Sequence, residues 1–152
     1  MHSNKGFTLV EILIVVIILG ILAAIVIPQF TEASNDARES ALKSDLQTIR
    51  SQVELYKIQH LDCLPGLQAD GSIDDDDFVD DMTGQTDQDG TAGTAFGPYL
   101  QSFPTNPFVS GAAASTIVSG AGDPDADGAS GWWLNTTTGK VSPNDDEGYD
   151  DL

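Results

Sequence analysis

The first part of the chain is a short polar stretch, residues 1–6, followed by residues 7–27, which are apolar at nearly every position. As a helix, this run is about 30 Å long, which matches the hydrocarbon thickness of a bilayer. Its residues are apolar on every face, whereas a helix of a soluble core is apolar along one stripe. A secretory signal would carry a small-residue cleavage site after a shorter run. The pattern therefore predicts a membrane-spanning helix that stays in the protein.

After Pro28 the pattern becomes that of an amphipathic helix, residues 28–60. Apolar residues recur at alternating spacings of four and three, with charged residues between them: Leu42, Leu46, Ile49, Val53 and Tyr56. Pro28 has no amide hydrogen, so it either ends the first helix or kinks a longer one. We expect a kink, because the helical pattern resumes at once. The sequence Leu64-Pro65-Gly66 ends the helix at the latest.

The rest of the chain, 61–152, is acidic and rich in turn residues. From Ile58 onward there are eighteen acidic residues and one base, Lys140. This charge disfavours nucleic acid as a partner and suits divalent cations. The stretch 70–93 is predicted as a Gly- and Asp-rich loop, and 116–118 as a short strand. Two further strands are expected at 132–135 and 140–142, joined by the turn 136–139.

These elements together predict an α+β fold. The second half of the long N-terminal helix packs with its apolar stripe on a small antiparallel β-sheet head with long acidic loops. About ninety residues are enough for one small domain with a thin core. Cys63 is the only cysteine, which excludes an intrachain disulfide, and the two histidines are His2 and His60. No pattern of catalytic residues stands out, so we expect no enzyme.

A possible calcium loop precedes the last two strands. Asp123, Asp125 and Asp127 alternate along the chain and are followed by Gly128, the arrangement in which carboxylates converge on Ca²⁺ as the backbone turns. It is not a complete EF-hand, which needs an acid where Leu134 stands. The alternative is a solvated acidic loop. The sequence favours calcium as a cofactor, because the two tryptophans that follow need an ordered backbone.

The stretch from Lys5 to Phe30, KGFTLVEILIVVIILGILAAIVIPQF, resembles the class III leader and N-terminal helix of type IV pilins and type II secretion pseudopilins. The resemblance implies that residues 1–6 are a leader, that a prepilin peptidase cleaves after Gly6, and that the new amine of Phe7 is methylated. Glu11 matches the acidic residue of the mature N-terminus, and Pro28 matches the helix proline of the family.

Glu11 is the one ionisable residue in the apolar run, where a carboxylate is costly and usually functional. After cleavage, Phe7 would carry a cationic amine in the same apolar setting. A pair between the two groups offsets both desolvation costs, and breaking it leaves a buried charge worth about 3–5 kcal/mol. The pair forms either within one helix or with a neighbouring subunit, which would set the register of a filament. The alternative is a carboxylate that reaches the membrane interface.

The head carries a second resemblance. Residues 97–100 (GPYL), 104–108 (PTNPF) and the aromatic hairpin with its Thr-Gly turn resemble the head of the major pseudopilin of type II secretion. Major pseudopilins hold calcium in this part of the head, although their ligand pattern is not reproduced residue by residue here. The resemblance implies a filament subunit whose partners are itself, prepilin peptidase, minor pseudopilins and the inner-membrane secretion platform.

The sequence leaves three functions open. The first is a type II secretion pseudopilus subunit that drives protein export, anchored by one span in the bacterial inner membrane with its head in the periplasm. The second is a type IV pilin for adhesion, motility or DNA uptake, which would reach the cell exterior. The third is a monomeric, membrane-anchored calcium-binding domain. Processing after Gly6 separates the first two from the third.

Overall fold

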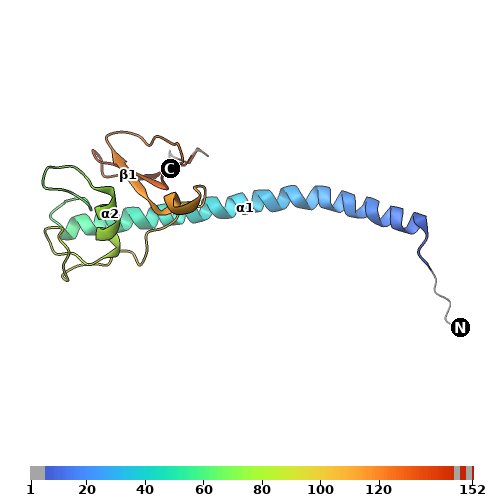
Figure 1. Cartoon of the computed structure of the whole chain (residues 1–152), viewed down its shortest axis with the longest axis horizontal. Coiled ribbons are helices and arrows are strands. Elements are labelled where there is room, and N and C mark those ends of the chain that lie inside the picture. The colour runs from blue at the N-terminus through green and yellow to red at the C-terminus, as the bar shows by residue number, and fades with distance from the viewer. Residues whose placement is uncertain (1–5, 146–147, 150–151) are drawn as a thin grey trace. The chain divides into compact units, whose positions relative to one another are not determined.

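A computed structural model describes residues 6–145, 148–149 and 152 of the chain. Its elements are three helices and three strands (Figure 1): α1 (Leu9–Gln59), α2 (Asp75–Thr83), the 3₁₀ helix η1 (Gly111–Ser115), β1 (Ile117–Gly120), β2 (Trp132–Asn135) and β3 (Val141–Pro143). The chain divides into two compact units, Met1–Ala37 and Arg38–Leu152. Helix α1 contributes residues to both units.

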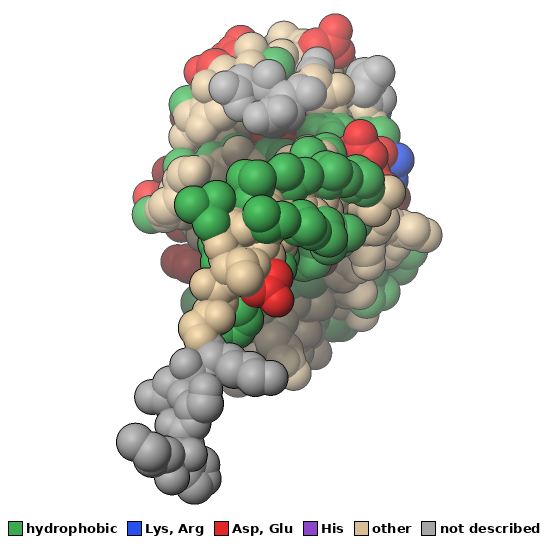
Figure 2. Space-filling model, turned by 90° about the vertical axis from the view of Figure 1, so that its right-hand side faces the viewer, with side chains coloured by type: hydrophobic (Ala, Val, Ile, Leu, Met, Phe, Trp, Pro, Cys, Tyr) green, Lys and Arg blue, Asp and Glu red, His purple; other side chains and the backbone are tan. Residues whose placement is uncertain are grey.

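The first unit contains the apolar part of α1. Its large apolar side chains from Ile12 to Ile27 are each at least half exposed, and together they form a continuous apolar surface (Figure 2). Among the described residues, α1 alone is long and apolar enough to cross a membrane. The helix continues through Pro28, which confirms that this proline does not end it.

The second half of α1 supplies the core of the second unit. The predicted stripe from Leu42 to Tyr56 is buried at all five positions. Around it pack Phe78 and Met82 of α2 and buried residues of the sheet. The amphipathic pattern is therefore confirmed as the face on which the head folds.

The sheet is mixed, with strand order β1-β2-β3. β2 and β3 form the predicted antiparallel hairpin, in which Trp133 lies opposite Ser142. β1 pairs with β2 in parallel, with Ile117 opposite Trp132. The prediction of an antiparallel sheet was wrong for β1, because residues 121–131 return the chain to the beginning of that strand before β2 starts.

Helix α2 lies in the segment 70–93 that was predicted as a loop. Its N-cap is Asp74, whose Oδ1 accepts the backbone N–H groups of Asp76 at 3.0 Å and Asp77 at 3.1 Å. Aspartate is among the best N-cap residues, and acids in the first turn interact favourably with the helix dipole. Phe78 and Met82, four residues apart on one face, are fully buried. The acidic run therefore begins a helix that is held by two core residues.

Asp81 of α2 hydrogen-bonds both to the last part of α1 and to the loop that follows α1. Its Oδ2 accepts the Tyr56 hydroxyl at 3.0 Å and the Gly66 backbone N–H at 2.8 Å. Burial raises the pKa of the Asp81 carboxyl, against the lowering effect of these two donors. His60 stacks on the Tyr56 ring at 3.7 Å and hydrogen-bonds Thr86 through Nε2 at 2.9 Å. These contacts give His60 a packing role at the helix end.

Candidate functional site

The predicted processing junction lies immediately before α1. Gly6 and Phe7 have no regular secondary structure, and the Phe7 side chain is 85 % exposed. A Cβ added to Gly6 would meet no atom within 4 Å. The fold therefore places the Gly6–Phe7 bond in accessible, non-helical chain, and it imposes no steric need for glycine at position 6. A requirement for glycine there would come from recognition by another protein.

Glu11 and Thr8 form a reciprocal cap at the beginning of α1. Glu11 Oε2 accepts the backbone N–H of Thr8 at 2.8 Å and its hydroxyl at 2.7 Å. In return, Thr8 Oγ1 accepts the backbone N–H of Glu11 at 3.2 Å. This is the capping box, in which two backbone donors that the helix leaves unpaired are satisfied. Thr8 was not predicted as a functional residue, although Thr-x-x-Glu before an apolar run is the signature of this cap.

The cap determines where the Glu11 carboxylate points. It reaches back along the helix to the N–H of Thr8, the residue next to Phe7. A free amine on Phe7 would come one residue before that N–H in the chain. Pairing within one helix and pairing with a neighbouring subunit both stay predictions. Pro28 lies inside α1, one residue beyond the membrane-length run.

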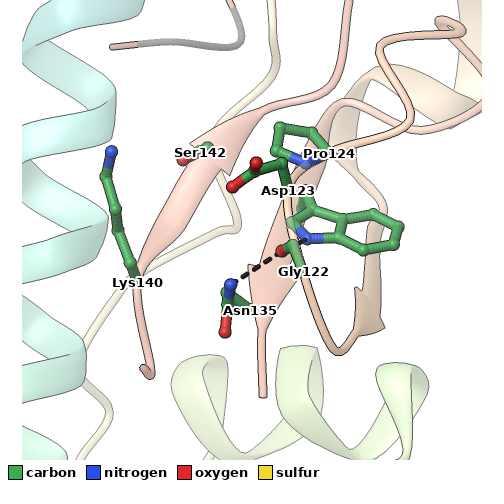
Figure 3. A pocket seen from close by; sticks show the side chains of 7 residues that line it. Gly122, Asp123, Pro124, Asn135, Lys140 and Ser142 are labelled. Carbon is green, nitrogen blue, oxygen red and sulfur yellow. Dashed lines mark hydrogen bonds between the residues drawn. The ribbon is translucent and has the colours of Figure 1, made fainter. Parts of the chain in front are cut away.

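The structure does not bring the three loop aspartates together. Asp123 lines a hollow of about 280 Å³ beside Ser142 and Lys140 (Figure 3). Asp127 Oδ1 is engaged elsewhere, accepting the backbone N–H of Ala129 at 2.9 Å. Among the described residues, no group of three or more Asp, Glu, His or Cys side chains is placed to hold a metal ion. Calcium binding by this loop stays a prediction, and the geometry offers it no ready set of carboxylates.

Comparison with known proteins gives one family match, in the N-terminal part of the chain, and several individual relatives. The profile of the prokaryotic N-terminal methylation motif matches residues 1–27. Type II secretion system core protein G of Pseudomonas aeruginosa is 44% identical over 59 residues, which are 39% of this chain and 42% of that protein. Type IV major pilin protein PilA of Myxococcus xanthus is 48% identical over 46 residues, which are 30% of this chain and 21% of PilA.

Competence protein ComGC of Halalkalibacterium halodurans is 36% identical over 77 residues, and the match covers 48% of this chain and 74% of ComGC. The chain belongs to the type IV pilin-like family. Its family and the apolar helix near its N-terminus together indicate a single-pass protein anchored in the inner membrane. The chain matches less than half the length of the secretion proteins it resembles. No solved structure gives a significant match to this pilin-like chain.

Proposed function

We propose that this chain is a structural subunit of a type II secretion pseudopilus. In this proposal, prepilin peptidase cleaves after Gly6 and methylates Phe7, and the mature chain polymerises through α1. The observation that carries it is the carboxylate of Glu11, held at the tip of a helix that is apolar and exposed on all faces. An isolated membrane anchor could use this acid only as a helix cap, whereas a filament core can also pair its charge with an amine.

The proposed action is mechanical and involves no catalysis. The apolar part of α1 keeps the subunit in the membrane until neighbouring apolar helices replace the lipid around it. The Glu11–amine pair makes this transfer feasible, because neither charge then enters the bundle uncompensated. The growing filament, with minor pseudopilins and the inner-membrane platform as partners, would push exported proteins outward. The acidic head remains in the periplasm as the outer layer.

A type IV pilin is the second candidate. The matches to PilA of M. xanthus and to the competence protein of H. halodurans favour it, since their identities to this chain, 48% and 36%, are comparable to the 44% of the secretion protein. The two functions share processing and polymerisation. They differ in what the filament does outside the membrane, which the N-terminal helix does not specify.

Mass spectrometry of the protein from its host tests the processing step. The assembled form should begin at methylated Phe7, and an assembled chain that begins at Met1 would overturn the proposal. A Gly6→Val variant is a clean companion, because the structure leaves space for a side chain at this position. It should accumulate uncleaved and folded.

A deletion strain separates the two filament functions. Loss of exported proteins from the culture medium, with surface pili and motility intact, would support the secretion pseudopilus. Loss of surface pili, twitching or DNA uptake, with export intact, would support the pilin instead. Complementation with the unchanged gene is the control for both outcomes.

A further inference from the structure

Two buried asparagines hold the segment that leads into β2. Asn106 and Asn144 are 1% and 2% exposed, and both hydrogen-bond to the carbonyl oxygen of Gly131. Asn106 does so through its side-chain Nδ2 at 2.9 Å, and Asn144 through its backbone N–H at 3.1 Å. Gly131 itself is packed tightly, because an added Cβ would lie 2.1 Å from the carbonyl oxygen of Ala114.

The side chain of Asn144 reaches into the acidic loop 123–130. Its Oδ1 accepts the backbone N–H of Ala126 at 2.9 Å. Its Nδ2 donates to Ser130 Oγ at 2.9 Å and to Asp127 Oδ1 at 3.3 Å. The orientation of the amide follows from chemistry, because the Ala126 N–H can only donate and must face the oxygen. The nitrogen therefore faces Asp127.

These contacts surround Asp127 Oδ1 with N–H donors, where a calcium site would place the ion. A calcium ion needs oxygen atoms that converge on it. Here Asp127 Oδ1 accepts two N–H donors, from Ala129 and from the Asn144 amide. The backbone of Asn144 adds a further tie, since its carbonyl accepts the N–H of Gly128 at 3.1 Å. One residue thus contacts the loop at several consecutive positions.

We propose that the Asn144 amide, and not a bound calcium ion, orders the loop 123–130 and so positions β2. Asn144 is a positioning residue in this scheme. A second amide–carboxylate contact, from Asn106 Nδ2 to Asp145 Oδ2 at 3.0 Å, holds the other side of Gly131. The consequence is a head whose folding does not follow the calcium concentration around it. This inference concerns folding alone, so it stands or falls independently of the filament proposal.

The test is thermal unfolding of the full chain in detergent, in CaCl₂ and in chelator at matched ionic strength. Tryptophan emission is followed as well, because Trp133 Nε1 donates to Gly122 O at the beginning of the same segment. The wild-type protein should give the same Tm and the same emission in both solutions. Asn144→Ala should lower the Tm by about 5 °C in both solutions and shift the emission to the red. Gln101→Ala, an exposed amide truncated in the same way, should change neither.

Asp127→Asn is the discriminating variant. An asparagine oxygen can accept the same two N–H donors, so the Tm in chelator should stay within about 2 °C of wild type. A calcium loop would instead lose a charged ligand. A wild-type Tm that rises in calcium, with a rise that Asp127→Asn abolishes, would overturn the inference. It would also be overturned if Asn144→Ala behaved like Gln101→Ala in both Tm and emission. If Asn144→Ala does not fold, the wild-type and Asp127→Asn measurements still decide.

Discussion

Glu11 has two separable roles, and three substitutions distinguish them. Glu11→Gln keeps an oxygen that can accept from Thr8 and removes only the charge. Thr8→Ala removes the reciprocal cap and keeps the charge. Glu11→Ala removes both. All three chains should still enter the membrane, because none makes the apolar run more polar than it is now.

The expected magnitudes differ enough to be measured. Losing the cap costs about 1 kcal/mol, which corresponds to about a fivefold weaker subunit addition, since 1.4 kcal/mol is tenfold. Losing the charge leaves the Phe7 amine unpaired in an apolar bundle at a cost of about 3–5 kcal/mol, which is about a hundredfold to several thousandfold in the same measure. Glu11→Gln should therefore nearly abolish assembly, and Thr8→Ala should only reduce it.

The assay is the amount of filament sheared from host cells that contain equal total amounts of each variant. Mass spectrometry of Phe7 in the same samples shows whether cleavage and methylation still occur, which separates a processing defect from an assembly defect. If processed Glu11→Gln assembled as well as wild type, while Thr8→Ala and Glu11→Ala both failed, the carboxylate would be a helix cap and the pairing argument would be wrong.

Three further predictions concern the head. Burial raises the folded-state pKa of Asp81, so the folded protein takes up this proton at a higher pH than the unfolded chain does, and this carboxyl should lower stability as pH rises above about 4. Asp81→Asn should flatten that part of the profile of Tm against pH, and an unchanged slope would count against this prediction. Ile49→Ala, at a fully buried position, should cost about 2–5 kcal/mol of unfolding free energy in denaturant titrations, whereas Ile58→Ala, at a position that is 80% exposed, should stay within about 0.5 kcal/mol. Gly131→Ala should lower the unfolding free energy in the same titration series, because its Cβ would collide with the backbone of Ala114, and a neutral result would mean that η1 shifts easily.

The sequence predicted the parts of this fold that depend on local periodicity. The alternating spacing from Leu42 to Tyr56 identified the buried stripe, and the aromatic and β-branched residues around the Thr-Gly turn identified the β2–β3 hairpin. Both patterns are repeated over many residues, so single exceptions do not hide them. The helical continuation past Pro28 followed from the same reasoning.

The features that were missed depend on single residues or on contacts between distant segments. The composition of the acidic run concealed α2, although Asp74 as a cap and the spacing of Phe78 and Met82 were visible signals. The parallel pairing of β1 depends on the path of residues 121–131, which no local pattern specifies. The contact between Asn144 and Asp127 joins residues seventeen apart, and it exists only once the hairpin has folded.

The start of α2 has a consequence for the environments in which this head can fold. In the acidic run, the Asp74 carboxylate accepts hydrogen bonds from two backbone N–H groups, and the charges interact favourably with the helix dipole. The same charges also repel one another. Dissolved salt screens exposed charges over about 10 Å at 0.1 M, so both charge effects fade in brine, while the short hydrogen bonds at the cap persist. In dilute buffer, repulsion within the run 74–77 opposes folding of the head. At high ionic strength the main remaining effect of the run is to cap the start of α2.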